Sequence, residues 1–179
     1  MHLHYSVVVF SCMFTSLLPA SFAGNTSFGW GAVNMQGAII ETACAIAVES
    51  QSQSIDMEVT SIADISRDGK GRVKPFAIEL INCVIERQDK SKTGWKNFQI
   101  TFDGDAEGNF FSVTGEASGI ALKITDQSGK MALPGRPLAH EDLTSENMKL
   151  NYNLHLVANQ SVLRAGEFFS AIRFKLDYF

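Results

Sequence analysis

Few residues of this sequence point to catalysis or metal binding. Its 179 residues include only three cysteines and four histidines. Neither Cys44 nor Cys83 belongs to a CxxC pair, so a redox or zinc site has little support. The sequence has no GxSxG motif, which leaves a serine hydrolase without its usual signature. We therefore expect no enzyme, no cofactor and no metal.

Basic residues are also scarce. The chain has 15 lysines and arginines against 19 acidic residues, for a net charge of −4. A nucleic-acid binder would normally carry a basic surface, so this class is not indicated. Hydrophobic residues make up 45% and charged residues 19%. These fractions, with the length, predict one folded domain with an adequate core and argue against disorder.

The N-terminus has the pattern of a signal peptide. Residues 5–18 form an apolar run without charges, and Ser21 and Ala23 fit the −3 and −1 positions of a cleavage site. The run is shorter than the roughly 20 residues of a membrane-spanning helix. We predict that residues 1–23 are removed. The alternative is an N-terminal membrane anchor.

If the chain is exported, two of its cysteines can form a disulfide. Cys12 would leave with the leader, so Cys44 and Cys83 would remain as an even pair in an exported chain. Such a pair predicts one disulfide, and two free thiols are the alternative. Closing a loop of this length would stabilise the domain by about 4 kcal/mol in a chain-entropy treatment.

The rest of the chain is patterned as strands. Apolar and polar residues alternate with period two over residues 73–83, 97–102, 120–125 and 150–157. Turns rich in Gly, Asp, Asn and Ser separate these segments. Residues 141–150 are the one place where a short turn of helix is expected. The pattern predicts a single all-β domain, a two-sheet sandwich.

The C-terminal segment is a long alternating strand at the edge of the predicted fold. Its apolar face consists of Phe168, Ile172, Phe174, Leu176 and Tyr178. Phe169 and Phe179 interrupt the polar face. A long apolar edge strand promotes aggregation unless it is covered. The cover is either another strand of the same chain or a strand from a different protein.

A second alternating segment lies before Cys44. Residues 31–40 have the sequence GAVNMQGAII, with Val33, Met35, Gly37 and Ile39 on one face. The predicted disulfide does not hold this segment. It either docks on its own domain or adds as a strand to another subunit.

Several of these segments together resemble the pilus subunits of the chaperone–usher pathway of Gram-negative bacteria. The resemblance is carried by residues 35–40, Ala43-Cys44, 80–83, 100–104 and 119–122, and by a C-terminal strand with Gly166 and Tyr178. The finer similarity is to minor subunits of the P-pilus type, in particular the one that terminates and anchors the rod. Residues 55–57, 100–104, 165–166 and 177–178 carry this likeness. The segment before Cys44 is shorter than the extension of that terminator, which keeps an internal rod or adaptor subunit as an alternative.

The resemblance implies an immunoglobulin-like sandwich that lacks its last strand and carries an N-terminal donor-strand extension. Residues 1–23 would be the signal peptide, 24–41 the extension and 42–179 the pilin domain. The donor side chains would be Val33, Met35 and Ile39, with Gly37 at a shallow pocket. The acceptor groove and its C-terminal strand would involve Gly166, Phe168, Ile172, Phe174, Leu176, Tyr178 and Phe179.

The resemblance also implies partners. A periplasmic chaperone would lend a strand to the groove, an outer-membrane usher would assemble the fibre, and neighbouring pilus subunits would exchange strands. Basic residues of the chaperone would hold the carboxylate of Phe179. The protein would be exported through the periplasm to an adhesive pilus on the cell surface. A stand-alone secreted immunoglobulin-like binding module is the alternative from a different class.

Overall fold

The computed structural model describes residues 32–179. The predicted leader and its cleavage site therefore lie outside the described residues. Residues 39–179 form one compact unit, and residues 32–38 belong to a separate N-terminal unit. Within residues 32–179, no helix combines the length and apolar character needed to cross a membrane.

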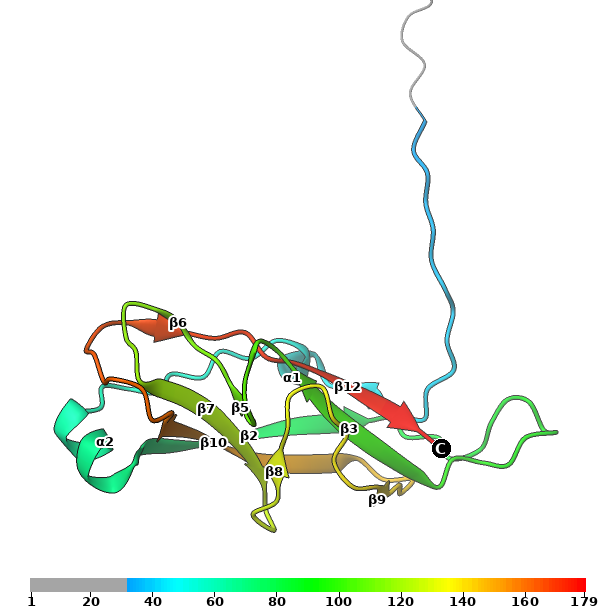
Figure 1. The fold of residues 1–179 in the computed structure, drawn as a ribbon. Coiled ribbons are helices and arrows are strands. Elements are labelled where there is room, and N and C mark those ends of the chain that lie inside the picture. Colours follow the sequence, from blue (N-terminus) through cyan, green and yellow to red (C-terminus); the bar gives the residue numbers. More distant parts are fainter. Residues whose placement is uncertain (1–31) are drawn as a thin grey trace, which may run out of the picture. The chain divides into compact units, whose positions relative to one another are not determined.

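The larger sheet of the compact unit is built on three long antiparallel strands (Figure 1). β10 (Met148–Ala158) lies between β2 (Lys70–Ile81) and β7 (Ile120–Asp126). Four short strands extend this sheet: β1 (Ala45–Ile46) beside β2, β5 (Phe110–Phe111) and β8 (Met131–Ala132) beside β7, and β4 (Ala106–Glu107) beside β5. The long strands contain the predicted segments 73–83, 120–125 and 150–157 except for residues 82–83.

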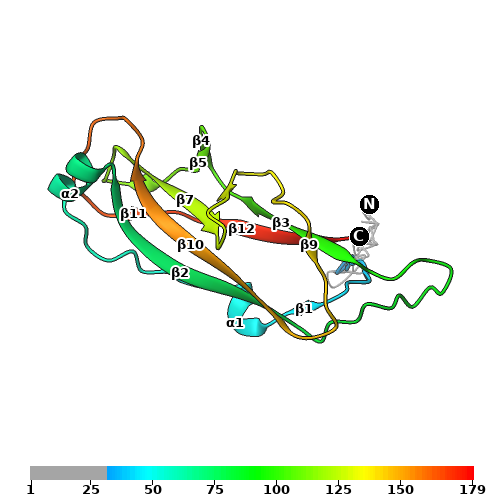
Figure 2. The ribbon, with the colours of Figure 1, turned by 90° about the horizontal axis from the view of Figure 1, so that it is seen from below.

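The second layer is smaller. β3 (Asn97–Asp103) pairs on one side with β12 (Arg173–Tyr178) and on the other with β9 (Glu141–Asp142). A separate two-stranded sheet joins β6 (Thr114–Gly115) to β11 (Phe168–Phe169). Figure 2 shows β3 and β12 side by side and apart from β2 and β10. The predicted all-β sandwich is confirmed.

The core lies between the two layers and follows the alternation of the strands. Inward-facing residues of β2 and β3 are almost inaccessible to solvent: Ile78, Leu80, Phe98, Ile100 and Phe102. Phe102 stacks edge-on against Tyr152 at 5.0 Å between ring centroids. Period two places successive side chains on opposite faces, so the pattern of these strands specified their buried side.

Two short helices connect strands. α1 (Val48–Gln51) follows β1, and α2 (Ile62–Asp68) precedes β2. Ser61 caps α2 by accepting a hydrogen bond from the Asp64 amide, and Gly69 ends it in the left-handed conformation. The prediction of a helical turn within residues 141–150 is wrong. This region instead supplies β9, because the Glu141–Asp142 backbone pairs with β3 and the Leu143 amide bonds to the Lys96 carbonyl.

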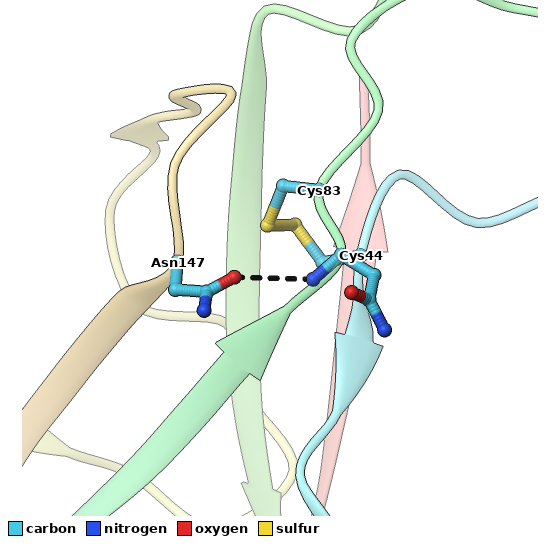
Figure 3. Close-up of a disulfide and its surroundings, with 4 residues drawn as sticks. Cys44, Cys83 and Asn147 are labelled. Carbon is cyan, nitrogen blue, oxygen red and sulfur yellow. Dashed lines mark hydrogen bonds between the residues drawn. A yellow bond between two sulfur atoms is a disulfide. The ribbon is translucent and has the colours of Figure 1, made fainter.

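The predicted disulfide between Cys44 and Cys83 is confirmed (Figure 3). It joins the chain just before β1 to the chain just after β2. Beside it, the Asn147 side-chain oxygen accepts a hydrogen bond from the Asn82 amide at 3.2 Å. These contacts fix the start of the compact unit against the end of its first long strand.

Candidate functional site

An apolar groove of about 1010 Å³ opens along one side of the compact unit. Its floor consists of four buried side chains from the larger sheet: Ile120 and Leu122 of β7, and Leu154 and Leu156 of β10. Residues 53–62 line one side and residues 163–170 with Ile172 the other. Because this floor is aliphatic, the groove suits apolar side chains.

Residues 163–172, called here the C-terminal wall, are held by the backbone. β11 pairs with β6, and the Glu167 carbonyl accepts hydrogen bonds from the amides of Glu116 (2.9 Å) and Ala117 (3.2 Å). Ser118 and Arg164 form a further antiparallel bridge. The half-buried side chains of Phe168 and Ile172 pack against the core and line the groove. This wall is an extension of the β structure.

Gly166 has a steric role in the same wall. Its φ is +156°, and a Cβ added there would lie 2.5 Å from Glu116 Cβ and 2.8 Å from the Ala117 nitrogen. Such distances are far below van der Waals contact. Only glycine allows the two segments to approach this closely.

Residues 53–61, called here the N-terminal wall, are held differently. No backbone hydrogen bond joins residues 53–60 to another described segment. Side chains supply the links: the Gln53 amide donates to the Ala77 carbonyl at 2.8 Å, and Arg72 Nε donates to the Val59 carbonyl at 3.3 Å. Glu58 forms ion pairs with Lys74 and with Arg72, the latter at 3.1 Å.

Charge at this wall depends on Glu58. The hydrogen bond and the charge of Lys74, with a smaller contribution from Arg72, hold the pKa of the Glu58 carboxyl below its ordinary value. The carboxylate is solvent-exposed, so salt screens its ion pairs. The N-terminal wall is therefore the side of the groove whose attachment responds to pH and ionic strength.

β12 follows the C-terminal wall along the chain. β12 pairs with β3 through Phe174 opposite Phe102, Leu176 opposite Ile100, and Tyr178 opposite Phe98. Among residues 32–179, no strand pairs with its other edge. In a complete immunoglobulin sandwich, the second sheet has three main strands, C, F and G. β3 and β12 take the places of C and F, β9 lies on the other side of β3, and no described strand takes the place of G beside β12, so the described domain is an incomplete sandwich.

Only some of the residues predicted for the groove line it in the structure. Gly166, Phe168 and Ile172 line it. The remaining half-buried residues, Phe174, Leu176 and Tyr178, lie farther along on β12 and pack against the core. Phe179 is exposed, and an oxygen of its carboxylate accepts hydrogen bonds from the backbone amides of Lys96 and Asn97. The single long C-terminal strand is interrupted at residues 170–172, between β11 and β12.

The residues predicted as donors form no strand in the described chain. Val33 and Met35 are 83% and 90% exposed, and Ile39 is fully exposed. A Cβ added at Gly37 would meet no atom within 4 Å. Their pairing with another chain stays a prediction.

Sequence reasoning missed the N-terminal wall and the floor as parts of the site. The floor residues lie on the apolar faces of the predicted strands 120–125 and 150–157. Alternation shows that such faces are buried, but it does not show which part of a face borders a groove. Residues 53–61 have no strand alternation, and the link from Glu58 to Lys74 joins positions whose proximity depends on the fold. No group of three metal-binding side chains is found within residues 32–179.

Sequence comparison relates the chain to fimbrial proteins. It is 31% identical over 150 residues to the PRS fimbrial minor pilin protein of Escherichia coli, covering 83% of this chain and 77% of the relative. The PAP fimbrial minor pilin protein of the same species matches equally well in identity and coverage. The Major MR/P fimbria protein of Proteus mirabilis is 30% identical over 84% of this chain and 85% of its own. No protein-family model matches the chain.

Solved structures agree on the fold. A crystal structure of the P pilus rod subunit PapA aligns with a TM-score of 0.69 at 22% identity, covering 76% of this chain and 99% of that one. A subunit in the structure of a chaperone-usher pilus aligns with a TM-score of 0.66, also at 22% identity, covering 84% and 96%.

Proposed function

The chain belongs to the fimbrial pilins of the chaperone–usher pathway, and on that basis we propose that it is a minor structural subunit assembled by donor-strand exchange. Its place is in a pilus on the cell surface, where its contacts are with neighbouring subunits. The similarity to two proteins named minor pilins favours the minor role.

The groove beside the C-terminal wall is the observation that carries the proposal. Its aliphatic floor lies beside this wall, and the chain runs on from the wall into β12, whose outer edge has no neighbour among the described strands. An added strand gains backbone hydrogen bonds from such an edge and specificity from pockets for alternate side chains. A periplasmic chaperone would fill the groove first, and a neighbouring subunit would replace it at the usher.

The N-terminal segment has the composition of a donor. Val33, Met35 and Ile39 alternate and expose large apolar side chains. Burying three such side chains contributes about 1.5–3 kcal/mol each before the cost of ordering the segment. Exposure of these apolar side chains to water is unfavourable, and insertion into the groove of a neighbour would bury them.

A variant of Gly37 tests the donor assignment. We expect Gly37→Arg to abolish incorporation of the subunit into pili, because an arginine cannot enter a shallow pocket in a neighbour's groove. The matched control is Ala38→Arg, one position along and therefore on the opposite face of the inserted strand. Pilus content is measured by immunoblotting of sheared fibres, and folding by the melting temperature. Incorporation of Gly37→Arg at the level of Ala38→Arg would overturn the proposal.

A second experiment assigns the position in the pilus. The chaperone-bound subunit is mixed with a synthetic donor-strand peptide, and release of the chaperone is followed by native gel electrophoresis. Ready exchange assigns an internal or adaptor position. Failure to exchange, with normal donation through residues 31–40, assigns the terminal position.

A further inference from the structure

A second cavity, of about 530 Å³, lies away from the groove and shares no lining residue with it. The end of β7 and the turn after it contribute Asp126, Gln127 and Ser128. β9 contributes Glu141, and residues 148–152 of β10 complete the lining. This cavity contains two carboxyl groups, the ammonium group of Lys149 and the hydroxyl of Tyr152.

The strand register turns both carboxyl groups inward. Asp126 of β7 is the partner of Tyr152 on β10, and Glu141 of β9 is the partner of Phe98 on β3. Directly paired residues project from the same face of a sheet. Since Tyr152 and Phe98 are buried in the core, the carboxyl groups face the interior from the two opposing sheets.

The polar groups of this cavity are incompletely satisfied. Tyr152 is only 2% exposed, and its hydroxyl has no hydrogen-bond partner among the described residues. Asp126 Oδ1 accepts hydrogen bonds from Ser128 Oγ and from the Lys130 amide. Within residues 32–179, neither Asp126 nor Glu141 has an ion-pair partner.

The protonation behaviour agrees with this geometry. Burial and then the charge of Asp126 raise the pKa of the Glu141 carboxyl. Burial, followed by the charges of Glu141 and Asp126, raises the pKa of the Tyr152 hydroxyl. The hydroxyl therefore lies within electrostatic range of both carboxylates. Lys149 also lines the cavity, but it forms its ion pair with Glu79 at 3.2 Å, so the two carboxylates have no cation of their own and a bound cation would relieve their repulsion.

We propose that this cavity, formed by Asp126, Glu141 and Tyr152, binds a guanidinium group. A guanidinium presents five N–H donors in a planar fork, which suits two carboxylates and a hydroxyl oxygen that converge from different strands. A calcium ion needs six to eight oxygen ligands, and no group of three acidic or other metal-binding side chains occurs in the described chain. The cavity also has far more volume than a single ion requires.

A guanidinium can come from an arginine side chain of a neighbouring subunit or from a small free molecule. The test begins with the purified full chain and methylguanidinium chloride as the probe, followed by the NMR signals of Tyr152. We expect saturable binding in the millimolar range. Tetramethylammonium has the same charge but no N–H donor, and we expect it to bind at least fivefold more weakly.

The variant Glu141→Gln keeps the shape of the side chain and removes its charge. We expect about a tenfold loss of affinity for methylguanidinium, as for loss of one charge-assisted hydrogen-bonding partner. Glu146→Gln, at an exposed position in the same region, is the matched control and should bind as the unaltered chain does. Without the probe, Glu141→Gln should have a higher melting temperature than the unaltered chain, because the variant no longer buries an unpaired carboxylate.

Repeating the titration on assembled pili distinguishes the two sources. Loss of probe binding in pili assigns the site to an arginine of a neighbouring subunit, and retained binding assigns it to a small molecule. Absence of binding to the purified chain would overturn the proposal. So would equal affinity of Glu141→Gln and Glu146→Gln, or a lower melting temperature of Glu141→Gln without the probe.

Discussion

The C-terminal wall of the groove is held by backbone hydrogen bonds, whereas the N-terminal wall is held by side chains. The first includes the β6–β11 pair and the amides that bind the Glu167 carbonyl. The second depends on the ion pairs of Glu58 and on the contacts of Gln53 and Arg72. The two sides of the groove are therefore held in place by different kinds of interaction.

The difference indicates which side adapts to an inserted strand. Moving the C-terminal wall requires breaking a ladder that continues into the folded sheets. Moving the N-terminal wall breaks no such ladder. It exchanges exposed ion pairs and side-chain hydrogen bonds for water, each of which contributes little to stability, and it disturbs the packing of Met57 and Ile55 on the core. We infer that the C-terminal wall provides the fixed template, and that the N-terminal wall sets how readily the groove opens.

The largest effect is expected from Gly166→Ala, which breaks the fixed wall. The new Cβ would collide with Glu116 and with the Ala117 backbone, so the free energy of unfolding should fall by about 3 kcal/mol. Gly129→Ala is the matched control: its φ is also positive, but its Cβ would meet no atom within 4 Å. We expect it to cost about 1 kcal/mol from backbone strain alone. Urea denaturation measures both, and equal losses would contradict the steric role of Gly166.

Much of the fold could be predicted because it depends on alternation. The four long segments with period two became β2, β3, β7 and β10, and their apolar faces became the core. The prediction of a helical turn within residues 141–150 failed because tertiary pairing of β9 with β3 overrode the local pattern. The break at residues 170–172 coincides with Ser170, a polar residue on the otherwise apolar face of this alternating segment.

The two walls also differ in how far their place at the groove could be predicted from the sequence. Phe168 and Ile172 belong to an alternating segment, so their place at an apolar edge could be expected. Val59 and Thr60 line the groove on the opposite side without any periodic pattern. That wall depends on contacts such as Glu58 with Lys74, and long-range pairs of opposite charge cannot be identified from a single sequence.

A smaller effect is expected from Phe168→Ala, which keeps the backbone of the fixed wall but removes an apolar side chain from the groove. Because Phe168 is half-buried, we expect a loss of about 1–2 kcal/mol in stability and about a tenfold weaker affinity for a donor-strand peptide. Phe110→Ala removes a half-buried phenylalanine of β5, which does not line the groove. It should lower stability without changing peptide affinity. Calorimetric titration distinguishes the two, and similar affinities would contradict a role of Phe168 in the groove.

The smallest effect is expected at the adaptable wall. Glu58→Gln removes the ion pairs with Lys74 and Arg72, so the wall should open more easily and a donor-strand peptide should associate about two- to threefold faster. Stopped-flow measurements of peptide binding test this expectation, with Glu146→Gln as a control for loss of an exposed carboxylate elsewhere. The difference between Glu58→Gln and the unaltered chain should shrink in 0.5 M salt, because exposed ion pairs are screened.

The dependence on pH has a defined sign. The folded state holds the pKa of Glu58 below its ordinary value of 4.5, so its ion pairs contribute fully above that pH and are lost as the pH falls through the lower folded-state value. The unaltered chain should therefore associate more slowly than Glu58→Gln at pH 7 and converge with it in acid. Equal rates at pH 7, or a difference that grows in acid, would show that the N-terminal wall is not held by this carboxylate.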